Sequence, residues 1–256
     1  MKNKINEILS LVENKNFFEA KNACLNILKT VKNNEEIYNI YAIILTQLDQ
    51  TDQAILNWKK AIEIKSDYRH AYNNLGKAFL KLSKFNEALL NFEEVIRIDP
   101  KNFEAHYYRS LLLYDLQRYE DSINGWKNII NLKPDFIEAY IKIADIYCYL
   151  KQYNKAIDNY FSAYLIDPNH PFLLGNLLHT KSIICDWKDY DEYLKDLKEN
   201  LVKSKKTISP FVSLMLLESP KLQKLAAEIW TKEIKEKFNH IKNIENNNNK
   251  IKIGYY

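Results

Sequence analysis

The stretch RHAYNNLGKAFLKLSKFNEALLNFEEVIRIDPKN, residues 69–102, decides the fold of this chain. Pro100 stands near its end, at position 32, and Pro134 and Pro168 follow at intervals of 34 residues. A fixed period of that length is typical of stacked helix–turn–helix units, none of which buries its apolar face alone. We therefore expect five repeats, and extending the frame to both sides gives 1–34, 35–68, 69–102, 103–136 and 137–170.

The same frame brings residues of one kind to the same position of successive units. Small residues recur at positions 8 and 20, and mostly large rings recur at position 24. In chain order, position 8 holds Ala42, Gly76, Ser110 and Ala144, position 20 holds Ala20, Ala54, Ala88, Ser122 and Ala156, and position 24 holds Cys24, Trp58, Phe92, Trp126 and Tyr160. Antiparallel helices approach to about 8–10 Å where small residues face each other, and a ring fills the space beside the crossing. Proline at position 32 ends the second helix, because it cannot continue one.

Residues 1–170 resemble the tetratricopeptide repeat family. The residues that match its pattern directly are Gly76, Ala88, Phe92 and Pro100. The resemblance implies an all-α, right-handed superhelical solenoid. The first frame has charged residues where the family is usually apolar or has proline, so we expect a terminal cap with a polar outer face.

In this family the first helix of each unit lines a concave groove that binds protein segments. Carried onto this sequence, the groove includes Asn39, Asn73, Asn74, Lys77, Tyr107, Tyr108, Tyr114 and Asp145. Asparagine both donates and accepts hydrogen bonds, so it can pair with the backbone of an extended peptide of any sequence. Tyrosine adds contact area with a polar tip. The alternative is that these residues form a solvated face that binds nothing. The sequence contains no run of Lys and Arg in the groove that would predict binding of a carboxylate.

Composition excludes several other classes of function. With 46% apolar residues and only four glycines and six prolines in 256 residues, the chain is typical of a foldable helical protein. A net charge of +4 and the lack of a basic stripe beside the eighteen tyrosines argue against nucleic acid. Scattered histidines, cysteines without CxxC spacing and the lack of a glycine-rich loop predict no metal, cofactor-binding or catalytic residue. No signal peptide or membrane span is expected, which favours a cytoplasmic protein.

The part after the repeats also reads as helical, from residue 171 to 238, where the 34-residue period breaks. We expect Asp186 to cap the helix that follows it and Trp187 to cover the apolar end of the repeats. Residues 239–250 read as a polar linker, and Ile251–Tyr256 as a short strand that has nothing to pair with. The prediction is thus a C-terminal helical cap of the solenoid, followed by the first strand of an absent domain.

This tail is similar to the segment that joins repeats to catalytic lobes in bacterial SPINDLY-like O-GlcNAc transferases of glycosyltransferase family 41. The matching stretches are Leu177–Trp187 with Tyr190, Ser209–Phe211, Leu222–Ala227 with Trp230, and Lys250–Tyr255. The resemblance implies that the repeats recruit protein substrates for transfer of a sugar from a UDP-sugar to Ser or Thr, without metal. The family's groove has a ladder of asparagines at position 6, of which this chain keeps Asn74 among four units.

The sequence stops at Tyr256, before the family's catalytic histidine and its UDP-binding residues. The chain alone is therefore predicted to be inactive and without cofactor. We expect a truncated or split enzyme whose catalytic lobes would come from a separate chain. A stand-alone scaffold for protein–protein interaction is the alternative, and an adaptor unrelated to glycosylation is a third.

Overall fold

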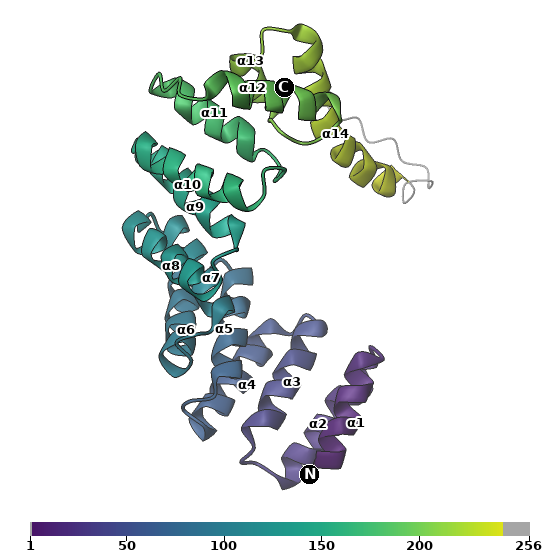
Figure 1. Cartoon of the computed structure of the whole chain (residues 1–256). Helices are drawn as coiled ribbons and strands as arrows, with labels where there is room; N and C mark the ends of the chain where they lie inside the picture. Colours follow the sequence, from purple (N-terminus) through teal and green to yellow (C-terminus); the bar gives the residue numbers. More distant parts are fainter. Residues whose placement is uncertain (1, 243–256) are drawn as a thin grey trace. The chain divides into compact units, whose positions relative to one another are not determined.

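A computed structural model describes residues 2–242 of the chain and the side chains of residues 3–232 (Figure 1). Fourteen helices and no strand make up the described part, which confirms the all-α prediction. These helices fall into two compact units, one within residues 1–134 and one beginning at Asp135. Each is described by itself.

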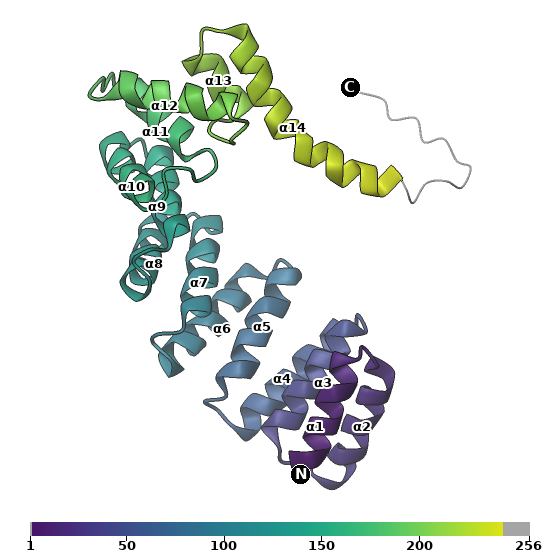
Figure 2. The ribbon, with the colours of Figure 1, turned by 45° about the vertical axis from the view of Figure 1, so that its right-hand side comes forward.

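The first unit is a row of antiparallel helix pairs (Figure 2). Its helices are α1 (Lys2–Glu13), α2 (Phe17–Thr30), α3 (Glu35–Gln47), α4 (Thr51–Ile64), α5 (Arg69–Lys81), α6 (Phe85–Ile98), α7 (Phe103–Asp115) and α8 (Tyr119–Leu132). Each helix packs on the next along the chain, as in a repeat solenoid. In the first frame Lys4 and Glu7 are exposed while Ile5 and Ile8 are buried, the pattern expected of a terminal cap.

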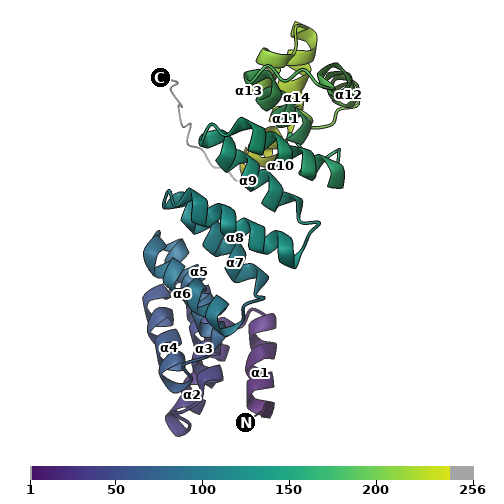
Figure 3. The ribbon, with the colours of Figure 1, turned by 60° about the vertical axis from the view of Figure 1, so that its left-hand side comes forward.

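The second unit contains the last full pair and four further helices (Figure 3). Its helices are α9 (Ile137–Tyr149), α10 (Tyr153–Ile166), α11 (Leu173–Ile183), α12 (Tyr190–Val202), α13 (Pro210–Leu216) and α14 (Pro220–Lys242). The expected linker was placed too early, because α14 continues four residues beyond Phe238. The remainder of that linker and the expected strand at Ile251–Tyr256 lie outside the described residues.

The second helix of every frame ends at position 30, at Thr30, Ile64, Ile98, Leu132 and Ile166. The first two frames have Lys32 and Ser66 where the others have proline, yet their helices end at the same place. Proline therefore reinforces an end that the repeat packing already fixes.

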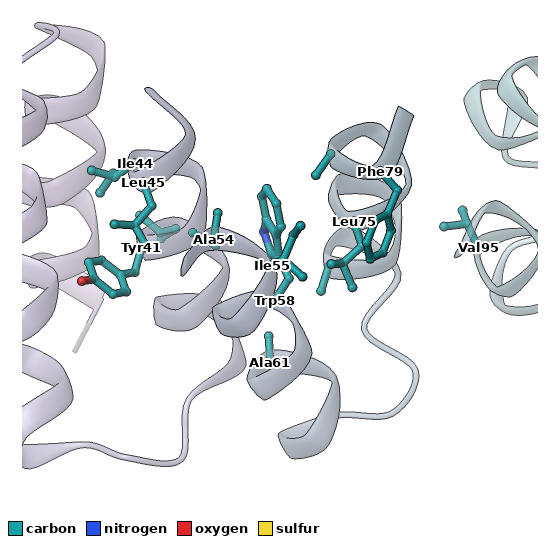
Figure 4. Close-up of a cluster of buried hydrophobic side chains, with 14 of the residues drawn as sticks. Tyr41, Ile44, Leu45, Ala54, Ile55, Trp58, Ala61, Leu75, Phe79 and Val95 are labelled. Carbon is teal, nitrogen blue, oxygen red and sulfur yellow. The ribbon is translucent and has the colours of Figure 1, made fainter. Parts of the chain in front are cut away.

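The packing columns are confirmed by burial. All five side chains at position 20 are fully buried, and those at position 24 are at most 3% exposed. A Cβ atom added to Gly76 would lie 2.8 Å from Cζ of Phe92, so only glycine fits beneath that ring. Figure 4 shows the packing between neighbouring pairs, where Trp58 and Ile55 of α4 face Leu75 and Phe79 of α5.

The turn between the two helices of a pair has one conformation throughout. The residue at position 15 has a positive φ of 56–59° in all five frames, although it is Lys, Asp, Ser, Gln or Lys and never glycine. The backbone N–H of position 16 then donates to the carbonyl of position 11, as from Lys84 to Phe79. This bond satisfies a carbonyl at the helix end that would otherwise have no partner.

The period extends one helix further than the sequence columns showed. In frame, Cys185 is the next position 15, and its φ is 54°. Asp186 N–H donates to the Lys181 carbonyl at 3.0 Å, the same bond as in the five preceding turns. Thus α11 is a sixth first helix, and the repeat geometry ends only after Asp186.

Two expectations for this end of the repeats were wrong. Asp186 does not cap α12, because its Oδ2 atom accepts from Lys181 Nζ at 2.5 Å and its Oδ1 atom from Lys188 N–H at 3.1 Å. Trp187 covers little, since it is 59% exposed and its ring contacts only the edge of Tyr190 among the described rings. The carboxylate of Asp186, which was expected to cap α12, is instead paired with the buried Lys181.

Candidate functional site

A pocket of about 360 Å³ lies in the first unit between α3 and α5, with α4 behind it. Its apolar lining comes from Ile43, Trp58 and Ala78. Polar and charged side chains complete the lining, namely Thr46, Gln47, Thr51, Asn74, Lys77 and Lys81. An apolar pocket with a few convergent polar groups is the usual form of a binding site.

Sequence reasoning placed only Asn74 and Lys77 of this set in the groove. Ile43 and Thr46 were missed, although they occupy positions 9 and 12, which face the groove in the family that the sequence resembles. Trp58 carried no such signal, because position 24 is a core column and its ring is 3% exposed. The pocket exists because a core ring forms part of its wall.

Asn39 was expected to face a ligand, but the structure buries it. Its side chain is 8% exposed, and its Oδ1 atom accepts from Trp58 Nε1 at 3.0 Å and from Asn74 Nδ2 at 2.9 Å. The expectation that Asn39 lines the groove surface is therefore wrong: its oxygen is taken by two donors of the protein itself. Its place is beneath the pocket, where it links α3, α4 and α5.

Asn73 and Lys77 of α5 both contact Glu104 of α7. Asn73 Nδ2 donates to Glu104 Oε2 at 2.7 Å, and Lys77 Nζ lies 2.6 Å from Glu104 Oε1. Burial alone would raise the pKa of Glu104, but the hydrogen bonds from Lys77 and Asn73 and the charge of Lys77 outweigh it and lower that pKa. Glu104 is thus held ionised. The Oδ1 atom of Asn73 is buried and finds no hydrogen-bond partner among the described residues.

The structure brings two lysines to one pocket, which the sequence analysis did not anticipate when it found no basic cluster. Lys77 and Lys81 stand one turn apart on α5 and both line the pocket. Lys77 is already paired with Glu104, whereas among the described residues Lys81 has only Asp49 at 3.9 Å, and both members of that pair are mostly exposed. An exposed pair of this kind contributes little, so Lys81 stays available to a ligand.

The three predicted groove tyrosines differ in role. Tyr108 stacks on Phe92 with ring centroids 5.1 Å apart, and Lys77 Nζ lies 5.9 Å from its ring centre. The rings of Tyr107 and Trp126 pack edge to face with centroids 5.4 Å apart. Tyr107 and Tyr108 therefore both pack against rings of the core. Tyr114 is 41% exposed, which leaves it as the predicted tyrosine best placed to touch a partner.

Asp145, the last predicted site residue, belongs to the second unit. The hydroxyl of Tyr160 donates to its Oδ1 atom at 2.5 Å. Burial raises the pKa of Asp145, and the bond from Tyr160 and the charge of Lys142 offset that effect only in part. Asp145 is therefore a half-buried carboxyl group fixed by the core ring of its own repeat.

In the second unit the chain itself covers the groove-facing positions 2 and 5 at the start of α11. The N–H of Phe172 donates to the Lys206 carbonyl at 2.6 Å, and the N–H of Gly175 donates to the Thr207 carbonyl at 3.0 Å. A Cβ atom at Gly175 would lie 2.9 Å from that carbonyl oxygen and 3.1 Å from the Cα of Ile208. These carbonyls satisfy the free N–H groups at the start of α11, where no described side chain forms a cap.

No group of three or more His, Cys, Asp or Glu residues that could hold a metal ion occurs in the described part of the chain. Within residues 2–242, no helix has both the length and the apolar character needed to span a membrane.

Comparison with known families identifies the repeats. Residues 44–83 match a family model described as TPR repeat, and residues 70–102 and 137–170 match models described as tetratricopeptide repeat. Over 70 residues the chain is 33% identical to tetratricopeptide repeat protein 37 of Xenopus laevis. That match covers 27% of this chain and spans 4% of the length of the relative.

Solved structures share the fold at low sequence identity. YrrB, described as a TPR protein with an unusual peptide-binding site, has a TM-score of 0.58 and 17% identity, with 80% of this chain and 98% of YrrB covered. PilF of Pseudomonas aeruginosa has a TM-score of 0.57 and 14% identity over 89% of this chain and 96% of its own. MamA has a TM-score of 0.57 and 21% identity over 62% and 93%. These likenesses confirm the all-α repeat solenoid.

Proposed function

The chain is a tetratricopeptide repeat protein, and we propose that its first unit binds an extended peptide segment of a partner protein in the pocket between α3 and α5. The protein acts as an interaction scaffold in this proposal. The observation that carries it is the pocket itself, in which an apolar lining from Ile43, Trp58 and Ala78 is combined with the polar groups of Asn74 and Lys81.

A peptide suits this site because its side chains and its backbone offer both kinds of contact. An apolar stem can lie against Trp58 and Ile43, while backbone or side-chain polar groups pair with the rim. The site was also expected in this place from the sequence, through Asn74 and Lys77. The peptide-binding site named for YrrB, which shares the fold, makes the same type of ligand a reasonable choice here.

The proposal is tested by filling the pocket. Peptides are first selected from a random library displayed on phage, with the full chain as bait, and their affinity is then measured by fluorescence anisotropy. The substitution Thr46→Trp places a large ring in the pocket, and Leu56→Trp places the same ring on α4 at a side chain that is 59% exposed and outside the pocket lining. We expect Thr46→Trp to weaken binding at least about tenfold, a loss of about 1.4 kcal/mol, and Leu56→Trp to leave it unchanged. Equal affinities of the two variants would refute the proposal.

A narrower function is proposed from the tail alone, namely that the scaffold recruits protein substrates to an O-GlcNAc transferase-like catalytic chain. Its support is the order of the stretches Leu177–Trp187, Ser209–Phe211 and Lys250–Tyr255 along the sequence. The family models match only repeat segments, so this function rests on the sequence resemblance. Supplying family catalytic lobes as a second chain with a UDP-sugar tests it. Transfer to Ser or Thr that depends on this chain is the expected result, and transfer that ignores it removes the hypothesis in favour of the plain scaffold.

A further inference from the structure

The Asn39 hydrogen bonds determine which end of the Asn74 amide faces the pocket. An indole N–H can only donate, so the atom of Asn39 that lies 3.0 Å from Trp58 Nε1 must be its oxygen. The Asn74 atom that lies 2.9 Å from that same oxygen must then be its nitrogen. With the nitrogen turned towards Asn39, the Asn74 oxygen is the branch left for the pocket, which Asn74 lines.

On its α5 side, the pocket therefore offers one fixed acceptor beside two ammonium groups. Asn74 presents its oxygen, and Lys77 and Lys81 lie one and two turns further along the same helix. Lys77 is compensated by Glu104 at 2.6 Å, while Lys81 is not tightly paired. A ligand that satisfies this set has to donate a hydrogen bond at one end and accept one at the other.

Simple side chains meet only half of that requirement. A ligand Lys or Arg donates to Asn74 but brings a second positive charge close to Lys81, which is only loosely paired. A ligand Asp or Glu pairs with Lys81 but turns an acceptor towards the Asn74 oxygen, so the ligand supplies that oxygen with no donor. An aliphatic side chain satisfies neither group.

We infer that the pocket takes the carboxamide side chain of a Gln or Asn in the bound peptide, and that Asn39 is the positioning residue that sets this preference. The carboxamide NH₂ donates to the Asn74 oxygen, and the carboxamide oxygen accepts from Lys81. The apolar lining at Ile43, Trp58 and Ala78 receives the methylene groups, and the second methylene makes Gln the better fit. This inference rests on the proposed peptide-binding function and names its ligand chemistry.

The test compares Gln with Glu at the anchor position of the tightest peptide from the phage selection. With the unaltered full chain, we expect Gln→Glu in the peptide to weaken binding about tenfold, because one hydrogen bond to the half-buried Asn74 is lost. With Asn74→Ala we expect that preference to fall below about twofold, because the acceptor is gone. The matched control is Asn57→Ala on α4, where the side chain only bonds its own helix, and it should retain the preference.

The role of Asn39 is tested by the same measurement, the ratio of the affinities of the Gln and Glu peptides. A merely structural role of Asn39 would leave this ratio unchanged. Asn39→Ala should abolish the ratio as Asn74→Ala does, although Asn39 touches no ligand. Asn39→Asp should restore it, since a carboxylate oxygen also accepts from Trp58 and Asn74. Circular dichroism checks folding, and if Asn39→Ala does not fold, the Asn74→Ala and Asn39→Asp chains decide.

The outcomes separate this inference from the proposed function. Selected peptides without a shared Gln or Asn, or a preference that survives Asn74→Ala, overturn the inference. If such peptides are still blocked by Thr46→Trp, the pocket remains a peptide site of another specificity. Peptides that bind Thr46→Trp normally, or a selection that recovers no binder, overturn both.

Discussion

The same face of the repeat is open on α5 and covered on α11. Asn73 and Asn74 stand at positions 5 and 6 of their unit, and Gly175 and Asn176 stand at those positions in α11. On α5 Asn74 borders a pocket and Asn73 binds Glu104, whereas on α11 the lack of a side chain at Gly175 lets the segment Lys205–Ser209 lie directly on the helix. The comparison shows that this face accepts extended backbone, supplied in the second unit by the chain itself.

The covered face also explains how the repeats end. Ile208 and Thr207 are 2% and 6% exposed, so the segment is part of the core of the second unit. Ser209 then caps α13 through its side-chain oxygen, 3.4 Å from Val212 N–H, with Pro210 at the first helical position. The groove-facing side of α11 is in this way closed and stabilised.

The largest expected effect comes from removing the anchor of the covering segment. Ile208→Ala should lower the free energy of unfolding of the second unit by about 2–4 kcal/mol, through lost burial and the cavity it leaves. Urea denaturation followed by circular dichroism measures the change. The exposed neighbour Lys205 provides the control, since Lys205→Ala should cost less than about 0.5 kcal/mol. Equal small losses for both variants would mean that the segment is not packed as described.

A single methyl group on the covered face should have the next largest effect. Gly175→Ala puts a Cβ atom 2.9 Å from the Thr207 carbonyl, and forcing backbone apart costs about 1–3 kcal/mol. The gain in helix propensity, about 1 kcal/mol, offsets part of this, so we expect a net loss of about 1 kcal/mol. Asn176→Ala, one residue on, has no such obstruction and should be neutral or slightly stabilising. A Gly175→Ala chain as stable as Asn176→Ala would contradict the close approach.

In the first unit, a substitution in the turn after α5 should raise the free energy of unfolding by a smaller amount. Ser83 has a φ of 56°, a conformation that costs an L-residue about 1 kcal/mol and glycine almost nothing. Ser83→Gly should therefore raise the free energy of unfolding of the first unit by about 0.5 kcal/mol, after the greater chain entropy of unfolded glycine is subtracted. Leu82→Gly, one residue earlier with negative φ, should be destabilising. Thermal denaturation in the two variants distinguishes them by the sign of the shift.

The smallest effect concerns charge at position 9, where α5 has Lys77 and α9 has Asp145. The pKa of Asp145 is raised by burial in the folded state. For a raised pKa the folded state binds the proton more tightly, so this group favours folding below its unfolded pKa and loses that contribution as pH rises through its folded pKa. Asp145→Asn, which keeps an acceptor for Tyr160, should thus be slightly more stable than the parent at neutral pH and equal to it at low pH. A stability gain that grows as pH falls would reverse the assignment.

The sequence predicted the repeated part of the fold well because that part is built from local columns. Ala88 and Phe92 lie where the period requires them, and the turn at Ser83 recurs unchanged. What it could not predict depends on contacts between residues far apart in the chain. The segment that covers α11 lies about thirty residues later in the sequence. The repeat columns therefore give no indication that Gly175 contacts it.

The candidate site was predicted by position but not by role. Asn39 and Asn74 were both assigned to the groove from the family pattern, yet one lies beneath the pocket and the other borders it. What separates them is Trp58, a core ring whose single donor needs an acceptor when buried. The sequence alone does not indicate this hydrogen bond, because it forms only when α3, α4 and α5 pack together.

The open and covered faces are compared most directly by the indole N–H resonances of the four tryptophans in a proton–nitrogen correlation spectrum. Trp58 lines the open pocket, and Trp230 packs against Phe172 at the start of the covered helix, with ring centroids 5.0 Å apart. When a selected peptide is added to the full chain, we expect the Trp58 resonance to move with saturation and the Trp230 resonance to stay in place. A Trp58 resonance that stays fixed while peptide binds, or a shift confined to Trp230, would contradict the account.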